Sequence, residues 1–301
     1  MTSKARGTIC GIAAAMSYGC NPFALFLYAM GISVNSVLSY RYGIATLVLG
    51  LLMLLRRRPL RITRRQTALT AALGILFAGS SLTLFLSFRF IDAGLASTML
   101  FIYPVLVAVI MALFFGERLR PAVAAAIILA ITGVAFLCDS TVIGTGDIRG
   151  VLLVMLSSLL YAVYMVIVKV SRIALPADTL TYHVLAWGTV AIVAFSLIAP
   201  SEPLQLLHGA AQWGWAIFLA LVPTVISIIL TNAALREIGP TPTAILGALE
   251  PMTAVLIGTL VFGETFTPRL ATAIAVILTA VILVVAPRPK IHLNCNTHSK
   301  P

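Results

Sequence analysis

The sequence predicts an all-α integral membrane protein with ten transmembrane helices, arranged as two inverted five-helix repeats (5+5). Three observations support this prediction: an apolar composition, a regular series of apolar runs and an internal repeat. Hydrophobic residues make up 60% of the chain and charged residues 10%, with a mean hydropathy of +1.08. A soluble domain carries about a quarter charged residues. The chain has too few polar side chains to cover a surface in water, so a lipid bilayer is the solvent that fits its composition.

Ten apolar runs of roughly 17–23 residues follow one another along the chain, each long enough to cross the hydrocarbon core as a helix. Helices are required because a backbone in contact with lipid must satisfy its own hydrogen bonds. We place the spans near residues 7–28, 34–55, 67–88, 93–115, 121–138, 150–169, 179–199, 212–233, 242–262 and 269–286.

The 20 Lys and Arg residues indicate how these helices are oriented. With the N-terminus in the cytoplasm, 16 of them lie at cytoplasmic ends, whereas only Arg89, Arg149 and Arg269 lie at the opposite ends. This bias predicts a multi-pass protein of the cell (inner) membrane with both termini in the cytoplasm. The Arg-rich loop 56–66 fits a topology anchor, and binding of anionic lipid is the alternative. Because the basic residues fall in short gaps and form no stripe, we expect no nucleic-acid partner.

An internal repeat relates the two halves of the chain. Residues 89–121, shifted by 147 positions, fall on residues 236–268 without a gap, and nine of the 33 positions are identical. The identical pairs include Arg89/Arg236, Pro104/Pro251, Gly116/Gly263, Glu117/Glu264 and Pro121/Pro268. The halves are predicted at 7–138 and 150–286, followed by a disordered cytoplasmic tail at 287–301. A unit with five crossings places its second copy in the membrane upside down, so the repeats are inverted.

Inverted repeats predict a mechanism as well as a fold. Two similar halves that face opposite ways can pack in two near-equivalent arrangements, one open inward and one open outward, around a site near the bilayer midplane. The alternative is a duplicated membrane protein with a structural role only. We favour secondary transport by alternating access.

Several short motifs, taken in order, resemble the EamA-like family of the drug/metabolite transporter superfamily. They are Asn21-Pro22, which predicts a break in the first span, Ser39-Tyr40-Arg41-Tyr42, Ala93-Gly94-Leu95-Ala96-Ser97, Tyr103-Pro104, Phe115-Gly116-Glu117-Arg118-Leu119, Leu249-Glu250-Pro251 and Phe262-Gly263-Glu264. The resemblance covers nearly the whole chain. It implies ten helices with cytoplasmic termini, a central cavity, and export of amino acids or related metabolites by many members. The substrate itself does not transfer by resemblance.

Glu250 is the one acidic residue placed deep within a predicted span. An ionised group at the membrane centre costs ~2.5–3.5 kcal/mol on insertion scales, so it needs a partner or a purpose. One interpretation is that Glu250 takes up a proton or contacts a substrate amine. The other is that it stabilises a kink at Pro251, which cannot donate a backbone hydrogen bond. Its counterpart in the first half is Tyr103, so the two halves differ chemically at this position.

Polar and aromatic residues in the spans supply the other candidates for substrate binding. An aromatic ring with a polar tip can stack on a substrate and bond it at once. Serine in a span is also common as a packing residue. The predicted central cavity comprises Tyr18, Asn21, Ser80, Ser81, Tyr103, Tyr161, Tyr164 and Glu250.

Arg41 is the one basic residue placed well inside a span. It could bind a substrate carboxylate, form an ion pair with Glu250 for coupling or structure, or anchor its helix by bonding helix-end carbonyls. We favour the anchor. His183 lies at a comparable place in the second half and receives the same interpretation.

Other functional classes find little support in the sequence. A Walker-type phosphate loop, an HExxH motif and a Cys/His cluster are all missing, so we expect neither an enzyme nor a cofactor or metal site. We expect a monomer or weak homodimer whose partners are a small-molecule substrate and the lipid bilayer. The leading hypothesis is an exporter of amino acids or related metabolites, with proton coupling left open. The alternative is an uptake permease for a vitamin, a nucleoside-like compound or another organic solute.

Overall fold

The computed structural model describes residues 3–58, 60–116, 121–137, 148–171, 175–198, 203–238, 243, 246–247 and 249–285. The predicted tail at 287–301 lies outside the described residues. All regular secondary structure in the described part is helical, as predicted. Seven helical segments are long and apolar enough to cross a membrane, and three shorter apolar helices cover 124–133, 249–262 and 268–283. The count of ten spans and their inverted arrangement stay predictions.

The first helical segment is interrupted in its middle. Helix α1 (Ser3–Tyr18) gives way to the 3₁₀ turn η1 (Asn21–Phe23) and then to α2 (Ala24–Ala29). Proline in η1 has no N–H group and fixes its own φ angle, which ends the regular α-helical ladder here. The break predicted at Asn21-Pro22 is therefore confirmed.

The next two helices are continuous and begin with side-chain caps. In α3 (Val34–Leu55), the Ser33 hydroxyl accepts a hydrogen bond from the Ser36 N–H at 3.2 Å. In α4 (Arg64–Ser87), Thr63 and Gln66 form a reciprocal capping box. Both caps satisfy amide groups that a helix N-terminus would otherwise leave unpaired.

The remaining helices include two further breaks. The span after α4 divides into α5 (Ala93–Leu100) and α6 (Tyr103–Phe115), and a later span contains a π-helical turn, η2 (Leu221–Ile226), between α10 (Gly209–Ala220) and α11 (Ser227–Ile238). The others are α7 (Pro121–Leu137), α8 (Ile148–Val170), α9 (Ala177–Ile198), α13 (Leu249–Phe262) and α14 (Pro268–Val285).

Two matching glycines end matching helices. Gly116 follows α6 with φ +65°, and Gly263 follows α13 with φ +70°. Both values lie in the left-handed region, where glycine carries no steric penalty and commonly ends a helix. The internal repeat thus specifies the same backbone conformation in both halves.

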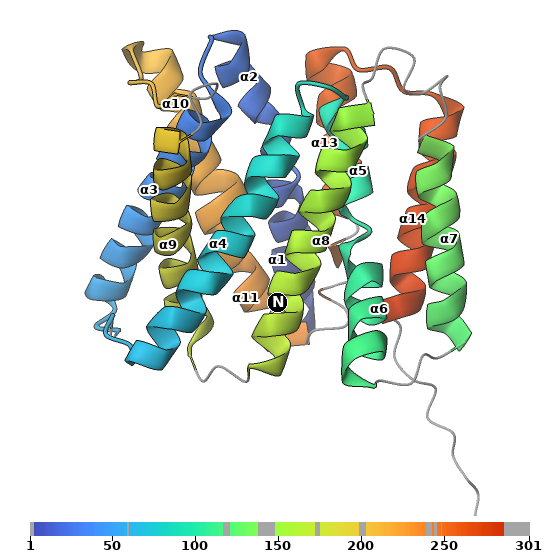
Figure 1. Cartoon of the computed structure of the whole chain (residues 1–301), viewed down its shortest axis with the longest axis horizontal. Coiled ribbons are helices and arrows are strands. Elements are labelled where there is room, and N and C mark those ends of the chain that lie inside the picture. The colour runs from blue at the N-terminus through green and yellow to red at the C-terminus, as the bar shows by residue number, and fades with distance from the viewer. Residues whose placement is uncertain are drawn as a thin grey trace, which may run out of the picture.

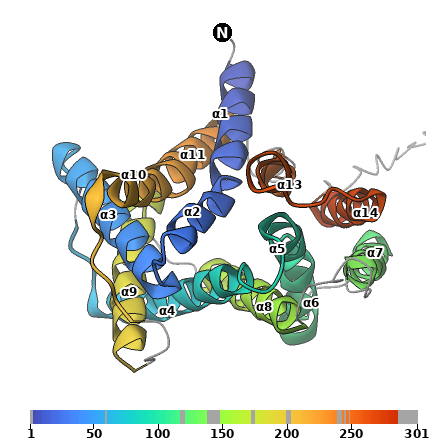
Figure 2. The same cartoon turned by 90° about the horizontal axis from the view of Figure 1, so that it is seen from above.

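The helices form one bundle with a central group and two edges (Figure 1). Helix α1 packs on α11, α4 packs on α8, and α5 packs on α13. Figure 2 shows α7 and α14 side by side at one edge, and α3 and α9 at the other. In the central group and at both edges, the helices of each pair are far apart in the sequence.

The bundle has an apolar exterior, and several hydroxyl groups are buried at its helix contacts. Leu47, Leu197 and Leu260 are 74–81% exposed on helices that would face water in a soluble protein. Ser157 and Ser158 are, in contrast, fully buried. An apolar exterior with hydroxyl groups at helix contacts is the distribution expected in a bilayer, where small polar residues link helices.

Candidate functional site

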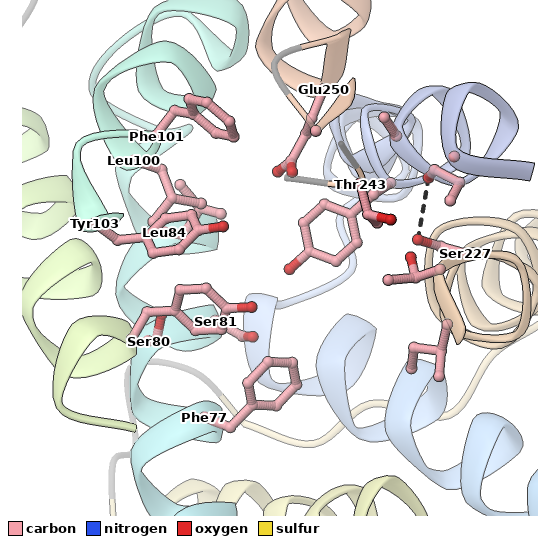
Figure 3. A pocket seen from close by; sticks show the side chains of 18 of the residues that line it. Phe77, Ser80, Ser81, Leu84, Leu100, Phe101, Tyr103, Ser227, Thr243 and Glu250 are labelled. Atoms are coloured by element: carbon pink, nitrogen blue, oxygen red, sulfur yellow. Dashed lines mark hydrogen bonds between the residues drawn. The ribbon is translucent and has the colours of Figure 1, made fainter. Parts of the chain in front are cut away.

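A cavity of about 350 Å³ lies in the middle of the bundle. Its volume is within the range of small-molecule sites. Figure 3 shows its side chains converging from several helices. The lining residues are Gly11, Ala14, Ala15, Tyr18, Phe77, Ser80, Ser81, Leu84, Leu100, Phe101, Tyr103, Tyr161, Ser227, Ile228, Thr231, Asn232, Thr243, Gly247 and Glu250.

The lining residues form stripes at helical spacing. On α4, for example, Phe77, Ser81 and Leu84 recur every three or four residues. Residues at these spacings share one face of a helix. Each central helix therefore presents one stripe to the cavity.

Backbone irregularities adjoin the cavity. The chain leaves the α-helix after Tyr18, is interrupted at Phe101 just before Tyr103, and passes through η2 just before Ser227. Irregular backbone in a membrane protein is tolerated where it borders protein or a polar cavity, because the freed groups can find partners there. In η2 the Thr224 hydroxyl donates to the Leu219 carbonyl at 3.1 Å, which supplies one such partner.

Aromatic rings make up one side of the cavity. The Tyr103 and Tyr161 rings meet edge to face, with centroids 4.6 Å apart and planes at 83°. The ring centroids of Phe77 and Tyr161 are 6.1 Å apart, and those of Phe101 and Tyr103 are 5.9 Å apart. These contacts fix the rings in preferred geometries. The cavity therefore offers a rigid aromatic surface with polar hydroxyl groups.

Glu250 supplies the only carboxylate among the lining residues. In Figure 3 its carboxylate is directed into the cavity, across from Tyr103. Its side chain forms no hydrogen bond or ion pair with another described residue. The chain just after α1 passes very close to α13, because a side chain at Gly19 would come within 2.7 Å of the Glu250 carbonyl oxygen. The first helical segment thus packs closely against the backbone of α13 at Glu250.

Six of the eight predicted cavity residues line this cavity together: Tyr18, Ser80, Ser81, Tyr103, Tyr161 and Glu250. The structure places Asn21 and Tyr164 outside the lining. Tyr164 instead stacks on Tyr161 with centroids 5.6 Å apart. Asn21 is buried at the break, where its Oδ1 atom has no partner among the described residues.

The two predicted serines also hold helices together. Ser80 donates to the Ser157 carbonyl at 3.0 Å, and Ser157 donates back to the Ser80 carbonyl at 2.7 Å. Ser81 is hydrogen bonded to the Tyr42 hydroxyl. These bonds join α4 to α8 and α3, so both hydroxyl groups contribute to packing.

Arg41 lies behind the cavity and does not line it. It is only 4% exposed, and its Nε donates to Thr224 Oγ1 at 2.8 Å. Its guanidinium lies 5.3 Å from the centre of the Phe85 ring, within cation–π distance. In this structure Arg41 forms no ion pair with Glu250. These contacts join α3 to the π turn of the other half through a threonine hydroxyl, so the anchoring of Arg41 on helix-end carbonyls stays a prediction.

Sequence reasoning missed several lining residues that spacing could have found. Phe77 precedes Ser81 by one turn, and Thr243 and Gly247 precede Glu250 by seven and three residues. Extending each stripe by one or two turns from a predicted member would have included them. Leu84 and Leu100 also lie three residues from a predicted member, but apolar residues are common throughout the spans and give no sign of a cavity.

Comparisons with known proteins identify the family. The chain matches the EamA-like transporter family over residues 5–138 and again over 148–286. Two proteins of Archaeoglobus fulgidus, each described as an uncharacterized transporter, are 27% identical over 64% of this chain and 67% of their own, and 24% identical over 85% and 90%. An uncharacterized protein of Pseudomonas aeruginosa is 28% identical over 85% of this chain and 86% of its own.

A solved structure is similar over 92% of this chain and 96% of its own, with a TM-score of 0.63 and 21% identity. At this identity the similarity concerns the fold alone. The two family matches together cover both halves of the chain. The apolar helices and the residues that line the cavity also come from both halves. The chain therefore belongs to the EamA-like transporter family of the drug/metabolite transporter superfamily, and it is a multi-pass membrane transporter.

Proposed function

We propose that the protein is a secondary active transporter that works by alternating access. The proposal includes ten spans in two inverted halves. It also places the protein in the cell (inner) membrane with both termini in the cytoplasm. The matching glycine ends of α6 and α13 and the cytoplasmic bias of Lys and Arg support it. Two halves whose helices end in the same way can each open or close the cavity at one face of the membrane.

The substrate that the cavity fits best is a small organic metabolite with an amine group, such as an amino acid or a related compound. The observation that carries this proposal is the Glu250 carboxylate, which lies in the cavity without a partner among the described residues. A cationic amine would supply the missing opposite charge through a charge-assisted hydrogen bond. Tyr18, Tyr103 and Tyr161 would contact the rest of the substrate through rings and hydroxyl groups.

Competition for Glu250 gives a simple route to coupling. A carboxylate that binds a proton is neutral and loses its attraction for an ammonium group. If a proton and a substrate amine occupy Glu250 in alternation, entry of one favours exit of the other. A proton gradient directed inward would then drive export.

Transport by purified protein in liposomes tests this proposal. A panel of labelled amino acids and amines is compared with matched compounds that lack the amine. Glu250→Gln should lower the rate for amine substrates by about 10–100-fold, because a hydrogen bond to a charged group is worth ~1.5–3 kcal/mol. Glu237→Gln is the matched control, since Glu237 lies at the end of α11 away from the cavity and contacts Ser3.

Each outcome tests a different part of the proposal. Equal rates for Glu250→Gln and the unchanged protein would remove Glu250 as the amine site. Flux that does not change with a proton gradient would exclude proton coupling but would not exclude Glu250 as the amine site. Faster net entry than exit under an inward proton gradient would favour the uptake permease over the exporter. If no compound in the panel moves, the proposed substrate class is wrong.

A further inference from the structure

A carboxylate at the end of α13 reaches across to the other half of the chain. Glu264 follows α13, and its side chain accepts a hydrogen bond from the Ala93 N–H at 2.7 Å and another from the Gly94 N–H at 3.0 Å. Its own backbone N–H donates to the Gly258 carbonyl at 3.0 Å. Gly263, with φ +70°, turns the chain so that this geometry is possible. The contact therefore joins α13 of the second half to α5 of the first.

Two glycines provide the space for this carboxylate. A side chain at Gly94 would come within 2.9 Å of both the Glu264 Oε2 atom and the Val255 Cα atom. A side chain at Gly258 would collide with the same carboxylate. Both helices therefore lack a Cβ atom where Glu264 lies between them, and the carboxylate occupies a fitted slot.

The contact takes the place of a helix cap. The first N–H groups of a helix have no partner within it, and they carry partial positive charge that favours an anion. Asp92 stands at the N-cap position of α5 but makes no capping hydrogen bond with its side chain. Glu264, from the other half of the sequence, supplies the anion in its place.

The Glu264 contact lies beyond one end of the cavity. The lining on α5 begins at Leu100, and on α13 it includes Glu250 and ends there. Roughly two to three turns of each helix separate the contact from these residues. The lining continues in the other direction to Gly11 and Asn232, toward the end of the bundle that holds Ser3 and Glu237. The cavity thus extends away from Glu264.

A cluster of aromatic rings closes the same end. It consists of Phe23, Phe26, Trp215, Phe218 and Phe262. The Phe26 ring lies 4.4 Å from that of Trp215 and 5.0 Å from that of Phe262, between centroids. The first two rings belong to the first half of the chain and the other three to the second. Two separate contacts between the halves therefore meet at this end.

Opposing effects act on the Glu264 carboxyl. Burial is the largest influence on the Glu264 carboxyl and raises its pKa above the ordinary value, whereas the hydrogen bonds from Gly94 and Ala93 act to lower it. Burial therefore disfavours the ionised form that the helix N-terminus favours.

We propose that the Glu264 carboxylate and the N-terminus of α5 form a latch that keeps one end of the cavity closed and must release when the cavity opens to the outside. The assignment of this end to the outside follows the charge bias of the loops. The proposal rests on the alternating-access function proposed above. Glu264 is in this sense a positioning residue, since it acts through α5 and α13 and does not touch the substrate.

Side-specific labelling tests the latch without any knowledge of the substrate. In full-length protein with Cys10, Cys20, Cys138 and Cys295 replaced by serine, the single change Leu100→Cys places a thiol in the cavity. A membrane-impermeant maleimide is added to sealed, oriented vesicles from either side. Glu264→Gln should raise the rate of labelling from the outside by about tenfold, because it removes the charge from two hydrogen bonds. Labelling from the inside should fall.

Two further variants make the test specific. Asp92→Asn neutralises an acid at the same helix end without removing a latch hydrogen bond, and it should label like the unchanged protein. Ala93→Pro removes one of the two donors while every acid stays in place, and it should raise outside labelling about threefold. Proline is tolerated at the first position of a helix, and the extended backbone of Asp92 (φ −55°, ψ 139°) suits a following proline.

The outcomes decide between the two proposals. The latch is overturned if Glu264→Gln and Ala93→Pro, each shown to be folded by thermal unfolding in detergent, label from the outside at the unchanged rate. It is also overturned if Asp92→Asn has the same effect as Glu264→Gln. If labelling changes as expected but no compound is transported, the latch stands and the substrate proposal falls. If transport is found and labelling does not change, the substrate proposal stands and the latch falls.

Discussion

The two halves of the chain place different chemistry at the same backbone position. Tyr103 and Glu250 correspond in the internal repeat, and each is followed by a proline. Both line the cavity, from opposite sides. At this position the proline is thus the same in both copies, while the residue before it, which lines the cavity, differs. Duplication has supplied the architecture, and the site depends on where the copies depart from each other.

Exchanging these two residues should have the largest effect. Glu250→Tyr removes the cavity carboxylate and should lower transport of amine substrates by about 100-fold. Adding Tyr103→Glu returns a carboxylate from the opposite wall and should recover about tenfold of that loss, since a long substrate amine can reach either side. Initial rates in liposomes measure both. Recovery to the full rate would mean that the asymmetry between the halves is unimportant, whereas no recovery would mean that Glu250 acts through its exact position.

Arg41 and His183 offer a second comparison between the halves, with an intermediate effect. Arg41 is buried and bonded to Thr224, whereas His183 Nε2 contacts the Leu60 carbonyl at 3.0 Å near a helix end. Arg41→Lys keeps the charge but loses the planar donor geometry, and should lower the free energy of unfolding by about 2 kcal/mol. His183→Ala should cost about 1 kcal/mol. Thermal unfolding in detergent tests this order, and equal losses would contradict it.

The matched prolines should show the smallest effect. Pro104 and Pro251 both lie in the first turn of a helix, where the missing N–H group would be unpaired in any case. Pro104→Ala and Pro251→Ala should therefore each change stability by less than about 1 kcal/mol, and by similar amounts. The same unfolding measurement checks this expectation. A loss several times larger in one variant would show that the two breaks are not equivalent.

Much of the fold could be predicted from the sequence because its signals are local. An apolar run predicts a membrane helix whatever its neighbours are, and Pro22 predicts a break because it removes an N–H group wherever it stands. The deep position of Glu250 was likewise visible from the position of its span alone. That it has no partner among the described residues depends on the packing of α1, α4 and α13, and therefore required the structure.

Asn21 shows where local reasoning fails. Its spacing of three from Tyr18 predicts a shared face only if the helix continues between them. The chain leaves the α-helix at Tyr18, and Tyr18 lines the cavity whereas Asn21 does not. Similarly, the Gly-Glu pair at 263–264 was visible in the sequence, but its partners at Ala93 and Gly94 are 170 residues away. No local pattern encodes such a pairing.

The π turn at Leu221–Ile226 has a consequence for how a solute would meet the protein. The matching helix of the first half, α4, contains no such turn. A π turn adds one residue to the helical path, which rotates everything beyond it by roughly 100° about the helix axis. Ser227 and Thr231 face the cavity in this rotated register. Deleting a single residue from the turn would rotate both hydroxyl groups away from the cavity. The rotation of α11 about its axis therefore decides how polar this side of the cavity is.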